Sequence, residues 1–499
     1  MHRRIPFFNY VLASLLILVG CRGTFELGVE RTPTPNRQAE MTVTALSQEN
    51  ARLAELLAAR ATPTITPPNL GRIAYVQGGD IWTRTLPAEK PLRLTTDGRN
   101  RAPRWSPTGN WLAFRRERQM IVQRQVPCEV PRARQELCLE PTPIIQNQVW
   151  VIEEGGNNAR PINRSLSIDY MAWSPVFDRL AYVTAEGELQ AVNADGTGLR
   201  LLNSIQSTDE TRGRTGRIAW SPDGNWLAYE WSIQTASDPT FTQSIWKVSA
   251  DGKTRIELYA NKSPTRNTLI LAGWSTQGAH VLFWQAPTRL STAIEGAYLF
   301  RIAATLSSGN GSAVQLSDEP TLPLADFVAP APVGPRPGIN ESVAMVIGAG
   351  RGTWSNKRID IAGVLSPPEY AAISPTWSPD GTRLAFAAMP ERRELLDPSL
   401  QELMQRRIWI ANLNSAAAPQ MLTTNLSYRD EHPLWSADGK YILFARIDTR
   451  GRASLWFIPL ENCSARQVVD ELTPTPDPIG AYGYVDWEGL FDWWRAGMG

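Results

Sequence analysis

The chain has 499 residues, more than one hydrophobic core usually organises, so we expect several domains or one large repetitive domain. The 50 Lys and Arg balance the 49 Asp and Glu, which argues against nucleic-acid binding through phosphate neutralisation. The 19 Trp and only three His favour aromatic packing over histidine-based catalysis.

Residues 1–20 have the features of a secretory signal peptide. Arg3 and Arg4 precede an apolar run, Val11 to Val19, that is too short to span a bilayer comfortably. The run leads into Leu-Val-Gly-Cys at 18–21, which resembles the lipobox of bacterial lipoproteins. This resemblance implies cleavage before Cys21 and lipidation of that cysteine, and more than one acyl chain would anchor the protein stably to a membrane. The alternative is an uncleaved signal anchor.

Export would place the remaining cysteines in an oxidising compartment. Cys128 and Cys138 lie in one Pro-rich insertion, where a disulfide between them can close a short loop. The alternative is two free thiols. Cys463 is left over, and we expect a small buried residue there. The chain has no Cys-x-x-Cys motif and no Cys/His cluster, so we expect no metal site.

Residues 21–70 have the composition of a tether. The Thr/Pro-rich stretches 32–35 and 62–68 are extended spacers that cannot pack a core. Between them, residues 38–61 favour a helix with a coiled-coil seam of apolar residues and one Asn. We expect either self-association through this helix or a semi-rigid spacer that lifts the main domain off the membrane. The seam residues are Val43, Leu46, Asn50, Leu53 and Leu57.

A unit made of a tryptophan, a tight turn and an apolar strand recurs along the rest of the chain. In the copy WSPDGNWLAY, which begins at Trp220, Pro222 sets the backbone angle of the turn and Gly224 tolerates its end. The strand that follows is apolar on both faces, so it must be covered on both sides, as it is when sheets stack face to face. The copies begin at Trp105, Trp173, Trp220, Trp274, Trp377 and Trp435.

Each unit continues with two further short strands, and four antiparallel strands in one repeat are typical of a propeller blade. A degenerate unit without tryptophan is expected at 327–347, in the long interval between Trp274 and Trp377. Residues 72–95 lack an innermost strand, and we expect the C-terminal segment 482–487, ending at Trp487, to supply it and close the ring.

The sequence therefore predicts an all-β protein with a single β-propeller over residues 71–490. Its four-stranded antiparallel blades number eight, or seven if the degenerate unit is only a loop. The N- and C-terminal strands pair to close it, the short helical tether precedes it, and residues 491–499 form a C-terminal tail.

The repeated WSPDGxxLAF-type sequence in an exported chain resembles the WD-like propeller repeats of the periplasmic protein TolB and its relatives. The resemblance covers about residues 71–490 and implies interaction with another envelope protein, although no residue identifies that partner. From the repeat itself we expect the recurring tryptophans to pack between blades. These residues are Trp105, Trp173, Trp220, Trp274, Trp377, Trp435 and Trp487.

We recognise no catalytic residues and no cofactor motif. The chain contains no Gly-x-Ser-x-Gly nucleophile elbow, and too few residues follow Trp487 for a hydrolase domain. The Asp-Gly pairs of the turns lack the further carboxylates that a calcium loop needs.

Polar residues just before two innermost strands are candidates for binding at one mouth of the central channel. Arg101 and Arg104 precede Trp105, and Asp430, Glu431 and His432 precede Trp435. The alternative is a solvated loop with a capping histidine.

These features predict a lipid-anchored extracytoplasmic protein of the bacterial cell envelope. Its propeller would act as a non-catalytic scaffold that binds a protein or peptide. The alternative is a sensor of small molecules or saccharides, or a hydrolase, that uses the channel. Convergent carboxylates or a metal at the mouth would favour the alternative, and a broad apolar or mixed-charge face would favour the scaffold.

Overall fold

The computed structural model divides the chain into two units, Met1–Thr66 and Pro67–Gly499. The described residues belong to the second unit. The predicted signal peptide, Cys21 and the helix at 38–61 lie outside them. The helices in the described part of the chain are too short or too polar to span a lipid bilayer. The described residues are 69–87, 89–127, 137–162, 168–204, 208, 211–235, 238–261, 267–287, 296–305, 311–332, 342–348, 357–361, 366–367, 369–391, 399–477 and 483–495.

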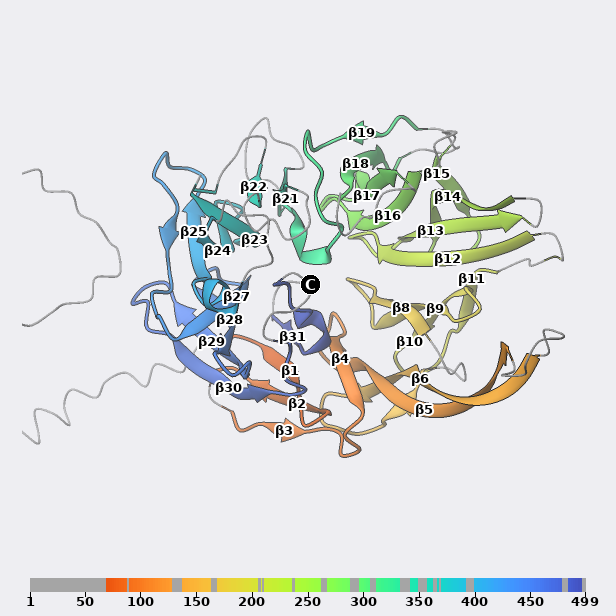
Figure 1. Cartoon of the computed structure of the whole chain (residues 1–499), viewed down its shortest axis with the longest axis horizontal. Helices are drawn as coiled ribbons and strands as arrows, with labels where there is room; N and C mark the ends of the chain where they lie inside the picture. Colours follow the sequence, from red (N-terminus) through yellow and green to blue (C-terminus); the bar gives the residue numbers. More distant parts are fainter. Residues whose placement is uncertain are drawn as a thin grey trace, which may run out of the picture. The chain divides into compact units, whose positions relative to one another are not determined.

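The second unit is built from eight antiparallel sheets, which follow one another around a common centre (Figure 1). In the described residues seven sheets have four strands and one has three. We number them as blades in chain order.

Blades 1 to 4 have four strands each. Blade 1 comprises β1 (Arg72–Gln77), β2 (Asp80–Thr85), β3 (Leu92–Arg93) and β31 (Phe491–Trp494). Blade 2 comprises β4 (Asn100–Trp105), β5 (Trp111–Pro127), β6 (Leu137–Glu153) and β7 (Arg160–Pro161). Blade 3 comprises β8 (Ile168–Trp173), β9 (Arg179–Thr184), β10 (Leu189–Asn193) and β11 (Arg200–Asn203). Blade 4 comprises β12 (Thr211–Trp220), β13 (Trp226–Thr235), β14 (Asp238–Ser249) and β15 (Arg255–Ala260).

Blades 5 to 8 complete the circle. Blade 5 comprises β16 (Asn267–Trp274), β17 (His280–Pro287), β18 (Tyr298–Ala303) and β19 (Val314–Gln315). Blade 6 comprises β20 (Val328–Pro330), β21 (Val343–Ile347) and β22 (Arg358–Asp360). Blade 7 comprises β23 (Tyr370–Trp377), β24 (Arg383–Pro390), β25 (Arg407–Asn412) and β26 (Gln420–Met421). Blade 8 comprises β27 (Tyr428–Trp435), β28 (Tyr441–Asp448), β29 (Ala453–Pro459) and β30 (Arg466–Leu472). The described helices are η1 (Ala325–Phe327), α2 (Leu400–Leu403) and η2 (Trp487–Gly489).

The predicted all-β propeller with eight blades is confirmed. The degenerate unit at 327–347 supplies β20 and β21 of blade 6, so it is a blade and not a loop. The innermost strand of each of the other sheets ends at or next to a tryptophan.

In three repeats the tight turn is held by its serine and aspartate. The Ser221 hydroxyl donates to Asp223 Oδ1 at 2.5 Å and accepts from the Trp226 amide at 2.9 Å, while Gly224 has a φ of 68°. A residue with a Cβ atom adopts this φ only at a cost, which explains the glycine. Equivalent contacts join Ser378 to Asp380 at 2.5 Å and Ser436 to Asp438 at 2.6 Å. The aspartates therefore serve the turns.

The strand after the turn is buried on both faces, as its sequence predicts. In β13, Leu227 and Tyr229 pack into a cluster with residues of blade 3, whereas Ala228 packs into a cluster with Trp274 of blade 5. Burial of a side chain such as Leu227 stabilises the fold by about 2 kcal/mol. The hydrophobic core thus lies between consecutive blades.

A recurring hydrogen bond joins consecutive blades. In five repeats the tryptophan indole N–H donates to a carbonyl of the preceding blade, one residue before that blade's own tryptophan position. Blade 6 has Pro330 where the other blades have their tryptophan, and the carbonyl of the preceding residue, Ala329, accepts the bond from Trp377 of blade 7. The five bonds run from Trp173 to Arg104 at 3.0 Å, Trp220 to Ala172 at 3.1 Å, Trp274 to Ala219 at 2.9 Å, Trp377 to Ala329 at 2.8 Å and Trp435 to Thr376 at 3.0 Å.

The N- and C-terminal strands of the second unit pair to close the ring, but the closing strand is not the predicted one. The strand β31 pairs with β1, with Trp493 opposite Ile73 as Trp105 is opposite Leu112 in blade 2. Trp493 therefore occupies the repeat position that we assigned to Trp487. Trp487 instead begins η2, because Asp486 caps this helical turn by accepting from the Gly489 amide.

The boundary predicted at residue 490 is also wrong, because residues 491–494 of the expected C-terminal tail form β31. Phe491 and Trp493 are buried and alternate with less buried Asp492 and Trp494, which is the pattern of a strand with one face in the core.

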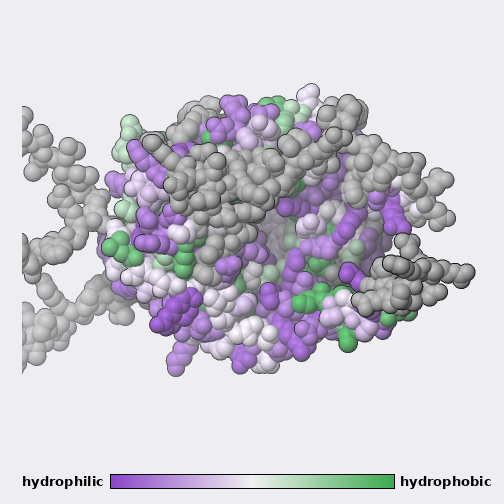
Figure 2. All heavy atoms as spheres, viewed as in Figure 1, coloured by the Kyte–Doolittle hydropathy of each residue, from purple (hydrophilic) through white to green (hydrophobic). Residues whose placement is uncertain are grey.

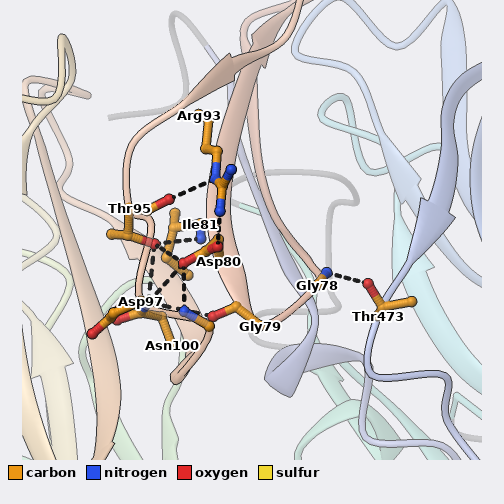
Figure 3. A network of polar contacts seen from close by, with 10 residues as sticks. Gly78, Gly79, Asp80, Ile81, Arg93, Thr95, Asp97, Asn100 and Thr473 are labelled. Carbon is orange, nitrogen blue, oxygen red and sulfur yellow. Dashed lines mark hydrogen bonds and ion pairs between the residues drawn. The ribbon is translucent and has the colours of Figure 1, made fainter.

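A polar network around Asp80 holds blade 1 against its neighbours (Figure 3). The buried Asp80 carboxylate accepts from Arg93 at 2.6 Å, from the Thr95 hydroxyl at 3.0 Å and from the Gly98 amide at 2.9 Å. Burial would raise the pKa of Asp80, but these donors together hold it below its ordinary value. The backbone amide of Asn100 donates to the Gly79 carbonyl at 2.7 Å and so joins blade 2 to the turn between β1 and β2. On the other side, the Gly78 amide donates to the Thr473 hydroxyl, just after β30 of blade 8.

Candidate functional site

A cavity of about 860 Å³ lies beside the innermost strands β4 and β8. The proximal parts of β5 and β6 and residues of the segments 474–477 and 484–490 complete its walls. The side chains that line the cavity include positively charged, negatively charged and aromatic ones. The charged lining residues include Arg101, Arg104, Arg115, Glu117, Asp486 and Glu488. Figure 2 shows that hydrophilic and hydrophobic residues are intermixed on the viewed face, which is hollowed near its middle.

A bulge in the innermost strand positions the two arginines of β4. Ala102 has a φ of 49°, and the pairing of β4 with β5 shifts register between Arg101 and Arg104. The equivalent residues Ser374 and His432, each three before its repeat tryptophan, also have positive φ, 54° and 51°. Bulges bend a strand and redirect side chains, and here both flanking arginines reach the cavity.

Two salt bridges line the cavity. Arg101 Nε lies 2.7 Å from Glu117 Oε1, and Arg104 Nη2 lies 2.6 Å from Glu488 Oε2. Arg104 also donates to the Glu488 carbonyl at 2.7 Å, which fixes the segment before β31 to blade 2. Because these side chains are partly exposed, each pair stabilises the fold by only about 1 kcal/mol or less.

Arg115 differs from the other two cavity arginines. Its Nη2 donates to the backbone carbonyl of Asp169 at 2.9 Å, and the contacts among the described residues give it no carboxylate salt bridge. Burial lowers the pKa of Arg115, and the positive charge of Arg104 lowers it further, whereas Asp169 and Asp486 act in the opposite direction. Arg115 therefore carries a charge that the cavity only partly compensates.

Of the five residues predicted at the channel mouth, only Arg101 and Arg104 line this cavity. Asp430 and Glu431 are 0% and 2% exposed, so they do not form the alternative solvated loop either. Asp430 Oδ1 accepts from Arg446 Nε at 2.7 Å. His432 lies 3.9 Å from Asp326 and meets Phe491 edge-on, with 5.6 Å between ring centroids.

Glu431 anchors the C-terminal segment inside the ring. Its carboxylate accepts from Arg429 Nε at 2.5 Å and from Trp487 Nε1 at 3.1 Å, and it forms a buried ion pair with Arg406. Arg406 also donates to the Gly483 carbonyl at 3.0 Å. Burial would raise the pKa of Glu431, but Arg429 and Arg406 outweigh it and hold the pKa below its ordinary value. Trp487 thus serves as a buried contact of the segment that precedes β31.

The predicted disulfide cannot be placed in the described structure. Cys138 lies in β6, but its side chain and all of Cys128 lie outside the described residues. Cys463 is half-buried and disulfide-bonded, so it is not the unpaired residue that we expected. Within the described ranges no group of three or more His, Cys, Asp and Glu is placed to hold a metal ion.

Sequence reasoning missed Arg115, Glu117 and Glu488. Arg115 and Glu117 lie just after the repeat strand WLAF at 111–114, where charged residues replace the apolar pattern of the repeat. That interruption is a signal that we did not use. Glu488 gives no local signal, because its place at the cavity depends on the path of the chain between β30 and β31.

Comparison with known proteins agrees with this architecture. No protein-family model and no curated protein matches the chain in sequence. Dipeptidyl peptidase 4 from Porphyromonas gingivalis superposes with a TM-score of 0.52 at 9% identity, over 82% of this chain and 61% of the peptidase. The fold is that of β-propeller proteins. This chain spans 61% of the peptidase, and at 9% identity the likeness extends to the fold alone.

Two further solved propellers are similar at lower TM-scores. TolB from Acinetobacter baumannii has a TM-score of 0.35 at 11% identity, covering 87% of this chain and 71% of TolB. The β-propeller domain of the Trilobed protease from Pyrococcus furiosus has a TM-score of 0.37 at 10% identity, covering 79% of this chain and 90% of that domain.

Proposed function

We propose that this chain is a lipid-anchored binding protein of the bacterial cell envelope. Its propeller presents the cavity beside β4 and β8 to a protein or peptide and catalyses no reaction. The observation that carries the proposal is the mixed charge of the cavity, in which arginines and carboxylates alternate and pair. Paired opposite charges of this kind are typical of the polar part of a protein interface.

Two carboxylates of the cavity, Glu117 and Glu488, are poorly suited to acid–base catalysis. Glu117 is paired with Arg101 and Glu488 with Arg104, and the residues that line the cavity include no histidine. A general base must be within reach of a substrate proton and hold a pKa near the working pH. An arginine lies 2.6–2.7 Å from each of these two carboxylates, so each would have to break its salt bridge before it could contact a substrate.

The walls of the cavity are held in place before any ligand binds. Trp173 joins β8 to β4 through the Arg104 carbonyl, and Arg104 in turn holds the backbone of Glu488. A rigid surface loses little conformational entropy on binding, which favours affinity. The anchor at Cys21 would keep the propeller attached to the membrane through the tether at 21–70.

Site-specific photo-cross-linking tests the proposal in the native cell. A photoreactive phenylalanine analogue replaces Glu488, whose side chain is 56% exposed at the cavity, in the full chain. The matched control carries the analogue at Leu426, which is 89% exposed between β26 and β27, away from the cavity lining. We expect a discrete protein adduct from position 488 and none from position 426. Equal adducts from both positions, or none from position 488, would contradict binding at the cavity.

A further inference from the structure

The hairpin of β5 and β6 extends far beyond its blade. Each strand has 17 residues, whereas the corresponding strands β9 and β10 of blade 3 have six and five. Figure 1 shows the two strands continuing outward past the other strands of blade 2. The pairing from Trp111 opposite Glu153 to Pro127 opposite Leu137 has no shift of register. We call the part beyond Arg116 the ribbon.

One face of the ribbon is apolar and exposed. Because successive residues of a strand point to opposite faces, the pairs Gln119–Ile145, Ile121–Pro143 and Gln123–Pro141 share one face. On this face Ile121 is 73% exposed and Ile145 is 60% exposed. The described side chains from Gln119 to Gln123 and from Leu139 to Ile145 on this face include no charged group. An exposed apolar face of this kind is typical of an interaction surface.

The apolar face of the ribbon is continuous with the cavity. Arg115, Glu117 and Asn147 point to the same face of the hairpin as Ile121 and Ile145, because they differ by an even number of residues. All three line the cavity. A ligand that fills the cavity and extends along this hairpin face would therefore contact the apolar face.

Arg115 gives this combined surface a preference for an anion. Its guanidinium has five N–H groups, of which the contacts among described residues use one, toward the Asp169 carbonyl. Burial and the positive charge of Arg104 disfavour the charged form of Arg115, so a ligand carboxylate would join Asp169 and Asp486 in stabilising it. An arginine–carboxylate pair is a strong, charge-assisted hydrogen bond.

We propose that the cavity and the ribbon form one docking surface for an extended segment of a partner protein. The segment places an acidic side chain or its C-terminal carboxylate on Arg115 and lays apolar residues on Ile121 and Ile145. The proposal rests on the proposed binding function and adds the chemistry of the partner. The amides of Gln119, Gln123 and Asn147 interrupt the apolar face, which suits a polypeptide better than a lipid chain.

Selection from a phage-displayed library of random peptides about 12 residues long tests the proposal. The bait is the full chain purified in detergent, and the enriched peptides are synthesised and titrated by fluorescence polarisation. We expect an acidic residue beside apolar residues in the enriched sequences. Arg115→Gln should weaken their binding about tenfold, the effect of losing one charge-assisted hydrogen bond.

Two exposed positions separate a binding role from a folding role. Ile121→Glu should weaken the peptides several-fold without changing thermal stability, because Ile121 is 73% exposed. The control Leu426→Glu changes a residue that is 89% exposed elsewhere, and it should leave binding unchanged. Failure to enrich any peptide, or enriched peptides whose affinity neither Arg115→Gln nor Ile121→Glu alters, would overturn the proposal.

Membrane binding and the proposed function are distinguished separately. Vesicles of phosphatidylglycerol test the alternative of a lipid surface. If they bind the wild-type chain more strongly than Ile121→Glu, and no peptide binds, the ribbon contacts lipid and the proposal is overturned. A cross-linked adduct at position 488 that persists undiminished in Ile121→Glu and Arg115→Gln would also overturn it. That last result would leave binding at the cavity intact.

Discussion

The indole Nε1 of Trp435 donates a hydrogen bond to the carbonyl oxygen of Thr376, 3.0 Å away in the preceding blade. The same relationship recurs at four other repeat tryptophans, so each ring is both a packing element and a link between sheets. Trp105 breaks the pattern. Its Nε1 is buried and has no hydrogen-bond partner among the described residues, whereas its backbone amide donates to the Asp492 carboxylate at 2.7 Å.

This difference predicts unequal costs for two similar substitutions. Both Trp435→Phe and Trp105→Phe shrink a buried ring, but only the first removes a hydrogen bond and leaves a carbonyl without its donor. We expect Trp435→Phe to lower the free energy of unfolding by about 1 kcal/mol more than Trp105→Phe. Urea denaturation of both variants measures the difference. Equal losses would show that the indole bond contributes nothing net.

Glu431→Gln should destabilise the fold strongly at neutral pH. The substitution leaves Arg406 and Arg429 buried without their shared counter-charge, which costs about 3 kcal/mol or more. The exposed Glu488→Gln is the control and should cost about 1 kcal/mol or less.

The cost of Glu431→Gln should depend on pH. The folded-state pKa of Glu431 is lowered, so its carboxylate stabilises the fold fully above the ordinary pKa of 4.5. This stabilisation is lost as the pH falls through the folded-state pKa, because both states then bind the proton. Denaturation from pH 7 to pH 3 should therefore show the gap between wild type and Glu431→Gln narrowing below about pH 4.5. A gap that stays constant or widens at low pH would contradict the assignment.

Removal of residues 491–499 should prevent stable closure of the ring. It deletes β31, which exposes the edge of β1 and removes Trp493 from the core. Exposed strand edges promote aggregation, so we expect this truncation to be insoluble or rapidly digested by protease. Removal of 496–499 alone spares β31 and should leave protease resistance unchanged. A stable protein lacking 491–499 would contradict the closure by Trp493.

The turn aspartates should act without calcium. Asp380 Oδ1 accepts from the Ser378 hydroxyl, from the Thr382 amide at 3.0 Å and from the Thr382 hydroxyl at 2.9 Å. Asp380→Ala should therefore lower the free energy of unfolding by about 1 kcal/mol, whether or not a chelator is present. Differential scanning calorimetry with EDTA and with added calcium checks this. A melting temperature that rises with calcium in wild type but not in Asp380→Ala would sink the interpretation.

Lipidation at Cys21 is testable in cells. Cys21→Ser removes the thiol that the lipobox resemblance marks for acylation, and we expect the protein to leave the membrane fraction. Thr24→Ser, three residues after Cys21, is the control and should keep the protein membrane-bound. Metabolic labelling with an alkyne fatty acid should mark wild type and not Cys21→Ser. A Cys21→Ser variant that remains in the membrane would favour the uncleaved signal anchor instead.

Much of the fold could be read from the sequence because it depends on local patterns. The turn from Ser221 to Gly224 is stabilised by its own side chains, and the strand after it alternates in a way that requires cover on both faces. Repetition of this unit then predicts the blades. Even the degenerate blade 6 was predictable, because the apolar run at Val343–Ile347 survives without its tryptophan.

The candidate site was only partly predictable. Arg101 and Arg104 were found because they precede a recognisable innermost strand. Asp430, Glu431 and His432 lie in the corresponding segment before Trp435. Asp430 and Glu431 are nevertheless buried and paired with Arg446, Arg429 and Arg406, which the position in the repeat does not reveal.

The amino-acid sequence by itself determined the turn, the strand and their repetition, since these follow from hydrogen bonds and side-chain alternation within a few residues. Tertiary structure decided which tryptophan closes the ring and which charges face the cavity. Trp493 rather than Trp487 completes blade 1 because its strand pairs with β1, so that Trp493 lies opposite Ile73, which is about 420 residues earlier in the chain. Such long-range pairing is selected by the packing of the whole ring.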